Sequence, residues 1–124
     1  MKVALITGGS KGIGFGIAES LLKSGYKVAI TSRTIDSANQ AASQLVAHGD
    51  VLAIEADVKS FESQQSAVNL IIEKWGQLDI LIANAGVGSF APIDEMDIEL
   101  WNDIIDTNLT GVFYSIANLK LAAA

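Results

Sequence analysis

The chain has 124 residues, enough for one compact domain, and its composition of 50% hydrophobic and 18% charged residues indicates a globular fold. A net charge of −6 argues against nucleic acid as a partner, because no basic surface is available to neutralise phosphates. With no cysteine, one histidine and no apolar run of the roughly 18 residues that span a membrane, the sequence predicts no disulfide, metal site or membrane segment and a cytoplasmic location.

The predicted elements alternate between strand and helix. Short apolar runs typical of strands buried on both faces lie at residues 3–6, 27–31, 51–56 and 78–83. Helices are predicted from about Ile13 to Gly25, over 35–47 with Thr34 as N-cap, from Ser60 to Gly76, and from about Ile98 onwards, after a loop over 86–96 that contains Pro92. This alternation predicts an α/β fold, a Rossmann-type doubly wound parallel sheet, and right-handed crossovers predict the strand order 3-2-1-4.

A glycine-rich segment, Thr-Gly-Gly-Ser-Lys-Gly-Ile-Gly at residues 7–14, joins the first strand to the first helix. In this place we expect Gly8 to form the turn, Gly12 to let a pyrophosphate approach, and Gly14 to contact the sheet. A flexible turn without a ligand is the alternative, but the strand before the segment and the helix after it favour a dinucleotide. The residues expected to meet the cofactor here are Thr7, Gly8, Ser10, Lys11, Gly12, Ile13 and Gly14.

Three further motifs follow in order: Asp57-Val58 after the third strand, Asn84-Ala85-Gly86 after the fourth, and Asn-Leu-Thr-Gly at 108–111. Together with the glycine segment they resemble the short-chain dehydrogenase/reductase family, over residues 2 to about 116. The resemblance implies an oxidoreductase that transfers a hydride between a nicotinamide dinucleotide and a small carbonyl or alcohol. It also implies that Asp57 and Val58 meet the adenine and that residues 84–86 line the cofactor crevice.

The resemblance assigns a catalytic role to Asn108, which in the family interrupts its helix and helps to hold a water in a proton relay. An exposed helical asparagine without a role is the alternative. Asp57 has an alternative too, because an aspartate in a loop often bonds its own backbone. The family often has two consecutive asparagines after the fourth strand, whereas this chain has Ala83 before Asn84.

The end of the second strand reads Thr31-Ser32-Arg33 and lacks the acidic residue that usually holds the ribose 2′-hydroxyl of NAD. A guanidinium pairs with a 2′-phosphate, so Arg33, with Lys11 as a second cation, predicts NADP(H) as the cofactor. The alternatives are that both are solvated surface charges, or that Asp36 pairs with Arg33.

Enzymes of the resembled family use a serine and Tyr-x-x-x-Lys, and this chain contains no Tyr-x-x-x-Lys. We therefore expect a truncated, inactive cofactor-binding half over residues 1–119, with 120–124 a vector-derived tail or a genuine helix end. A non-catalytic NADP-binding module, or a structural fragment, is the alternative. An open edge of the fourth strand, or the helix that carries Trp101 and Phe113, predicts a homo-oligomer.

Overall fold

The structure is a computed structural model that describes residues 1–86 and 97–123. The predicted loop over 86–96, with Pro92, therefore lies outside the described residues except for Gly86. In the described part of the chain, none of the helices is long and apolar enough to cross a membrane.

The described residues form a parallel sheet of four strands, β1 (Val3–Thr7), β2 (Lys27–Ser32), β3 (Val51–Glu55) and β4 (Ile80–Ala83). The strand order is β3-β2-β1-β4, which confirms the predicted order 3-2-1-4. At the centre of the sheet, Leu5 of β1 lies opposite Ala29 of β2 and Leu81 of β4. Strands β2 and β3 are thus added on one side of β1 and β4 on the other, and the crevice at such a switch point is where open α/β sheets bind ligands.

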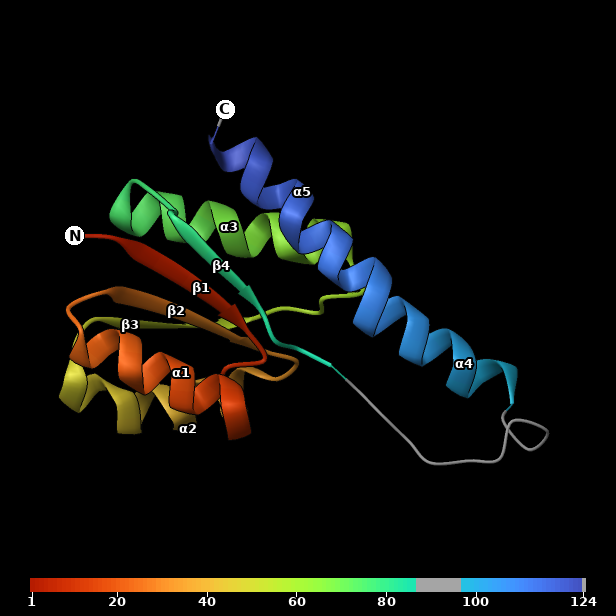
Figure 1. Cartoon of the computed structure of the whole chain (residues 1–124), viewed down its shortest axis with the longest axis horizontal. Helices are drawn as coiled ribbons and strands as arrows, with labels where there is room; N and C mark the ends of the chain where they lie inside the picture. The colour runs from red at the N-terminus through yellow and green to blue at the C-terminus, as the bar shows by residue number, and fades with distance from the viewer. Residues whose placement is uncertain (87–96, 124) are drawn as a thin grey trace.

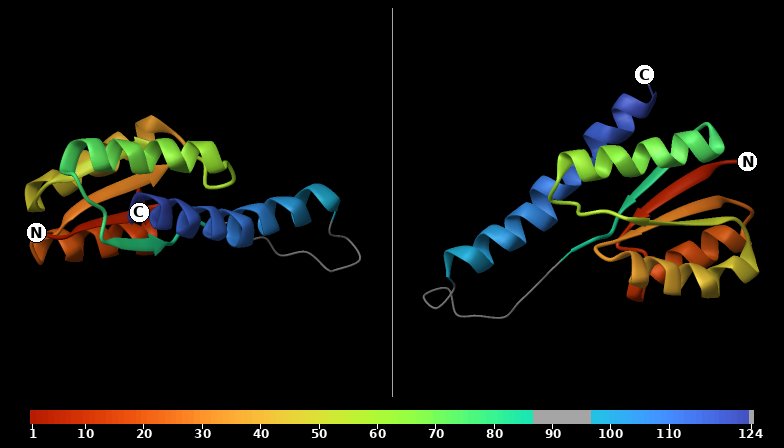
Figure 2. Two further views of the ribbon diagram at one scale, coloured as in Figure 1. Left: turned by 90° about the horizontal axis from the view of Figure 1, so that it is seen from above. Right: turned by 180° about the vertical axis from the view of Figure 1, so that it is seen from behind.

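Helices cover both faces of this sheet (Figures 1 and 2). α1 (Gly12–Lys23) and α2 (Ile35–Leu45) lie on one face, and α3 (Phe61–Trp75) and α5 (Gly111–Ala123) lie on the other. α4 (Ile98–Ile105) continues the line of α5 and extends beyond the carboxyl ends of the strands (Figure 1). The carboxyl ends of the strands and the start of the last helical segment therefore share one end of the molecule.

The core has two halves because successive side chains of a strand point to opposite faces. Ile6, Val28 and Ile30 pack on one face with Leu22 of α1 and Leu45 of α2. On the other face, eight buried residues pack together, namely Val3, Leu5, Ala29, Ile54, Ala56, Ala67, Val68 and Ile71. All five residues of β1 are buried, which explains why this strand is a continuous apolar run ending in threonine.

The predicted helix starts are confirmed at two caps. The Thr34 hydroxyl accepts a hydrogen bond from the Ser37 backbone N–H, and the Ser60 hydroxyl accepts one from Ser63. α3 ends at Gly76, whose φ of 76° is the left-handed conformation that favours glycine.

The first three strands each differ by one residue from the predicted ends, and three larger differences remain. The helix expected over 35–47 tightens after Leu45 into a 3₁₀ turn, η1 (Val46–His48). The fourth strand begins at Ile80 rather than at 78, and just before it the Asp79 carboxylate accepts a hydrogen bond from Val3 N–H. The last helix is interrupted by a π-helical turn, η2 (Asp106–Thr110), between α4 and α5.

Candidate cofactor-binding site

The glycine segment forms a tight connection between β1 and α1. Gly8 has φ 68°, and its N–H donates to Thr31 Oγ1 at 3.4 Å. A Cβ on Gly14 would lie 2.4 Å from Asn84 Nδ2 and 2.7 Å from the Gly8 carbonyl, so only glycine fits there. By contrast, no atom lies within 4 Å of the Cβ position of Gly12, whose φ is 62°. The loop is thus packed against the protein at Gly8 and Gly14, whereas the space beside Gly12 is open.

The amino terminus of α1 differs from those of α2, α3 and α4. Those three helices each begin with a side-chain cap, from Thr34, Ser60 and Asp97 respectively. At α1 the N-cap residue is Lys11, which makes no side-chain cap bond, and the first turn holds no acidic residue. Its first-turn N–H groups and the positive end of the helix dipole are therefore available to an anion, as a pyrophosphate requires.

The segment after β4 is hydrogen-bonded to Thr7 and Gly8 at the start of the glycine loop. Thr7 Oγ1 accepts from the backbone N–H of Asn84 at 3.1 Å and from that of Ala85 at 3.2 Å. The Asn84 side chain donates to the Gly8 carbonyl at 3.1 Å. The resemblance implied that Asn84 lines the cofactor crevice, whereas its amide lies under the loop and holds the turn at Gly8. One asparagine thus supplies a bracing amide even though Ala83 precedes it.

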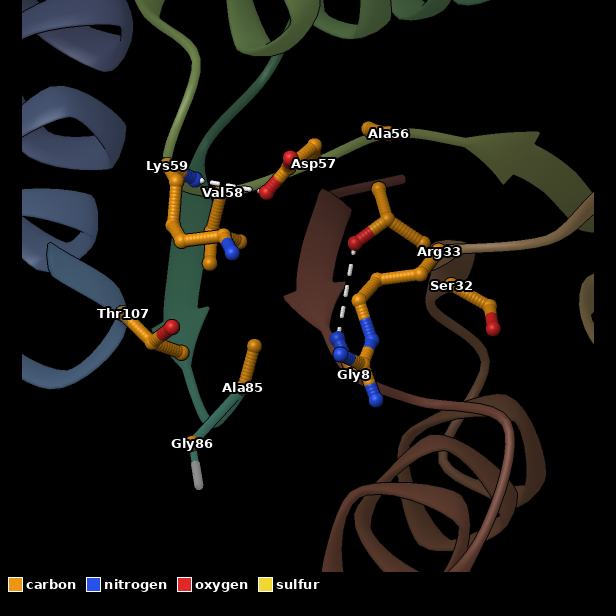
Figure 3. A pocket seen from close by; sticks show the side chains of 11 residues that line it. Gly8, Ser32, Arg33, Ala56, Asp57, Val58, Lys59, Ala85, Gly86 and Thr107 are labelled. Carbon is orange, nitrogen blue, oxygen red and sulfur yellow. Dashed lines mark hydrogen bonds between the residues drawn. The ribbon is translucent and has the colours of Figure 1, made fainter. Parts of the chain in front are cut away.

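The carboxyl ends of the strands enclose a pocket (Figure 3). It brings together six of the predicted cofactor residues, namely Gly8, Arg33, Asp57, Val58, Ala85 and Gly86. Five further residues complete the wall, namely Thr31, Ser32, Ala56, Lys59 and Thr107. In Figure 3, Arg33 lies on one side of the pocket, with Val58, Lys59 and Thr107 on the other. Polar and apolar residues thus line the pocket together, with the guanidinium of Arg33 on one side.

The predicted residues of the glycine segment do not all line one cavity. Gly8 lines the pocket, whereas Ser10, Lys11 and Gly12 line a separate groove between α1 and α2, together with Ser37 and Gln40. Thr7, Gly14 and the 78% exposed Ile13 line neither cavity. Arg33 and Lys11 therefore line two different cavities, each of which includes part of the glycine segment.

The charges around the pocket are partly paired. In the described ranges 1–86 and 97–123, ion pairs join Lys23 to Glu19 at 2.8 Å and Lys59 to Asp103 at 3.0 Å, and Arg33 is not paired with Asp36. The hydrogen bond to the Asp103 carboxylate raises the pKa of the Lys59 ammonium above its ordinary value. The nearby guanidinium of Arg33 opposes this rise by charge repulsion. The positive charge of Arg33 is thus available to a phosphate.

Asp57 has one carboxylate oxygen engaged with its own loop. Asp57 Oδ1 accepts from the Lys59 backbone N–H at 2.9 Å, and the Asp57 N–H donates to Ser63 Oγ at 2.9 Å. The alternative given by the sequence, a loop aspartate that bonds the local backbone, is therefore what this oxygen does. These bonds also fix the position of Asp57 at the pocket wall, and its contact with an adenine stays a prediction.

Asn108 lies in the middle of the π-helical turn η2. Its Oδ1 is 3.0 Å from the position that a Cβ on Gly86 would take, so the turn after β4 and the last helical segment meet here. The resemblance implied an interruption of the helix at this asparagine, and the widened turn is such an interruption. Thr107, the preceding residue, is buried and lines the pocket.

Sequence reasoning missed six residues of this region: Gln64 and the five further residues of the pocket wall, namely Thr31, Ser32, Ala56, Lys59 and Thr107. Each of the five wall residues lies within two positions of a predicted site residue, so position alone could have indicated them. Gln64 is a buried polar residue on the apolar face of α3, and a polar residue in an apolar helical stripe is a signal readable from the sequence.

A profile described as short chain dehydrogenase matches residues 2–120 of the chain. The chain belongs to the short-chain dehydrogenase family. This family membership confirms the resemblance that the four motifs indicated.

Relatives of this short-chain dehydrogenase have the same fold. The chain is 37% identical over 117 residues to 3-oxoacyl-[acyl-carrier-protein] reductase FabG of Staphylococcus aureus, covering 93% of the chain and 48% of that protein. It superposes on the Pseudomonas aeruginosa RhlG/NADP active-site complex with a TM-score of 0.91 and 36% identity, over 98% of this chain and 47% of that one. It superposes on alcohol dehydrogenase from the archaeon Thermococcus sibiricus complexed with 5-hydroxy-NADP with a TM-score of 0.92 and 34% identity. That match covers 98% of this chain and 53% of the other. The chain spans about half the length of the curated relatives that it matches.

The residues present fit the phosphates of a dinucleotide. The uncapped start of α1 offers N–H donors beside Gly12, where the Cβ position is open, and the pocket is lined by Val58 and Ala85 among others. Among the described residues, no group of three or more His, Asp or Glu side chains could hold a metal ion.

Proposed function

We propose that this short-chain dehydrogenase binds NADP(H) and is the cofactor-binding half of an oxidoreductase that reduces a carbonyl or oxidises an alcohol. The observation that carries the proposal is the juxtaposition of two features at the carboxyl end of the sheet. One is the uncapped amino terminus of α1 beside the open Gly12, and the other is the pocket with Arg33 at its rim.

Each part of the dinucleotide has its own group of residues in this proposal. The pyrophosphate lies over the glycine segment, against N–H groups around Gly12 and Ile13, with Ser10 beside them. The adenine lies in the pocket against Asp57, Val58 and Ala85. Thr7, Gly8, Gly14 and Asn84 hold the loop in its packed conformation, and Gly86 lets the backbone approach the cofactor closely. The 2′-phosphate lies between Arg33 and Lys11.

The preference for NADP(H) rests on charge. Arg33 is exposed and lines the pocket, and a charge-assisted hydrogen bond to a phosphate contributes about 1.5–3 kcal/mol. Structural relatives of this chain are described as complexes with NADP and with 5-hydroxy-NADP. We therefore expect NADP⁺ to bind more tightly than NAD⁺.

When bound, the nicotinamide supplies or accepts the hydride. The residue proposed for catalysis is Asn108. It lies in the π-helical turn beside Gly86, and its proposed role is to hold a water near the reaction centre. No Tyr-x-x-x-Lys occurs among the 124 residues, so we propose that they bind the cofactor without turning over a substrate. Residues 1–119 are the proposed nucleotide-binding unit, and 120–124 a tail.

The same lack of Tyr-x-x-x-Lys favours a second candidate function, a non-catalytic NADP-binding module or a structural fragment that self-associates. The two candidates differ in whether the source gene continues with a serine-bearing strand and a Tyr-x-x-x-Lys. Sequencing the source gene beyond codon 119 decides between them.

The test of the proposed function is a calorimetric titration of the chain with NADP⁺ and, separately, with NAD⁺. We expect binding of both, with NADP⁺ favoured. Tighter binding of NAD⁺ would contradict the role of Arg33 and Lys11. A folded sample that binds neither would show that the described residues are insufficient for a nucleotide site.

A further inference from the structure

One polar side chain in the core of the molecule has no part in the proposed function. Gln64 of α3 is 4% exposed and lies on the helix face that also buries Ala67, Val68 and Ile71. Burial of an amide in an apolar core is unfavourable unless its donors and acceptor are hydrogen-bonded. The hydrogen-bond partners of the Gln64 amide therefore indicate its structural role.

Gln64 connects two segments that are far apart in the sequence. Its Nε2 donates to the Val58 carbonyl at 2.6 Å and to the Gly111 carbonyl at 2.9 Å. Its Oε1 accepts from the Ser115 hydroxyl, whose single proton is shared with the Gly111 carbonyl at 3.0 Å from Ser115 Oγ. Both N–H donors of the amide and its oxygen are thereby satisfied.

The two segments joined by Gln64 lie on the same side of the pocket, across from Arg33 (Figure 3). Val58 belongs to the loop after β3 that lines the pocket. Gly111 directly follows η2, which carries Thr107, another lining residue, and Asn108. A Cβ on Gly111 would lie 3.0 Å from the Val58 carbonyl, so the two backbones are already in contact at this point.

We propose that Gln64 is a positioning residue that sets the separation of the adenine wall at Val58 from the turn that presents Thr107 and Asn108. The inference rests on the proposed nucleotide site, because the pocket matters only if a ligand occupies it. Neither carbonyl is free to shift without breaking a bond to the same amide. Occupation of the adenine pocket is therefore transmitted to the turn at 106–110.

The test compares Gln64→Met with the unaltered chain. Methionine keeps the unbranched shape and removes both N–H donors. We expect the affinity for NADP⁺ and for NAD⁺ to fall alike, by about tenfold, the factor that corresponds to one lost hydrogen bond of about 1.4 kcal/mol. The ratio of the two affinities should stay unchanged, since the 2′-phosphate is held elsewhere. Gln64→Leu, which also lacks both donors, replaces Gln64→Met if the latter does not fold.

A second measurement separates positioning from simple loss of stability. Amide hydrogen exchange over residues 106–111 should slow when NADP⁺ binds to the unaltered chain, and this slowing should be lost in Gln64→Met. Two controls should retain it: Ile71→Val, a mild core defect on the same helix, and Ser115→Ala, which leaves both bonds from Gln64 Nε2 in place.

The outcomes distinguish this inference from the proposed function. Unchanged affinities and unchanged exchange in Gln64→Met, in a background that binds NADP⁺, would overturn the role of Gln64 alone. Equal losses in Gln64→Met and Ile71→Val would also overturn it, because any core defect would then have the same effect. If the unaltered chain binds neither dinucleotide, the proposed function falls and the role of Gln64 falls with it.

Discussion

Single residues at the pocket carry the expected difference between NADP⁺ and NAD⁺. Arg33 follows β2, lines the pocket and is not ion-paired among residues 1–86 and 97–123. We predict that Arg33→Ala weakens NADP⁺ binding by roughly ten- to a hundredfold and leaves NAD⁺ binding unchanged, because the lost contact is to the 2′-phosphate. Calorimetry on both dinucleotides measures the effect. Lys74→Ala, a change of an exposed lysine on α3, is the control, and an equal loss for NAD⁺ would contradict the prediction.

Two glycines of α1 make a matched pair for testing how tightly the glycine loop is packed. A Cβ at Gly14 would collide with Asn84 and the Gly8 carbonyl, whereas nothing lies within 4 Å of the Cβ position at Gly16. We predict that Gly14→Ala destabilises the fold by about 1–3 kcal/mol. Gly16→Ala should stabilise it by about 0.5–1 kcal/mol, because alanine is the better helix former. Urea unfolding followed by circular dichroism compares them, and equal shifts would show that the loop yields around Asn84.

At the scale of elements, the loop after β3 is tied to both helices of the last segment. Gln64 and Ser115 join it to α5 inside the core, and Lys59 joins it to α4 at the surface through Asp103. The two connections contribute differently to the stability of the fold. The buried amide bonds are shielded from water, whereas an exposed ion pair contributes little because water and salt screen it.

The pH dependence of the Lys59–Asp103 pair follows from the raised pKa of Lys59. The folded state favours the protonated ammonium, so its stabilisation is present at neutral pH and is lost as the pH rises beyond the ordinary lysine pKa of about 10.4. We predict that Lys59→Ala lowers the free energy of unfolding by less than about 1 kcal/mol at pH 7. The difference from the unaltered chain should vanish at strongly alkaline pH, and also in 1 M salt.

Urea titrations of both chains at neutral and alkaline pH measure this difference. Lys74→Ala is again the control. A loss of stability in Lys59→Ala that persists unchanged at alkaline pH would show that the lysine acts through its aliphatic stem rather than its charge.

At the scale of the whole molecule, two surfaces of the described residues are suited to association with another chain. β4 is a terminal strand of the described sheet and pairs only with β1. On the last helical segment, Trp101 is 55% and Phe113 is 63% exposed, together with other apolar side chains, namely Ile98, Leu109 and Ile116. A strand edge and an apolar helix face both favour association.

We predict that the chain forms a homo-oligomer in solution. Sedimentation equilibrium over a range of concentrations measures the mass. Phe113→Glu should reduce the mass to that of a monomer if the helix face is the contact, and should leave it unchanged if the β4 edge is. A strict monomer at high concentration in the unaltered chain would refute the prediction.

Local signals in the sequence were sufficient to predict the order of elements, the caps at Thr34 and Ser60, and the strand order 3-2-1-4, which the structure confirms. Apolar runs and N-cap residues depend on a few neighbouring residues, and right-handed crossovers are a general rule for parallel strands, so these features can be read without knowledge of the fold. The four motifs also predicted the family correctly.

Tertiary structure alone decided how those motifs meet. Asn84 belongs to the predicted site, yet its amide braces Gly8 beneath the loop, because residues 76 positions apart become neighbours only when β4 pairs with β1. The link from Val58 through Gln64 to Gly111 likewise depends on α3 packing against α5. Such contacts join distant parts of the chain at distances of a few ångströms, and periodicity along the sequence carries no information about them.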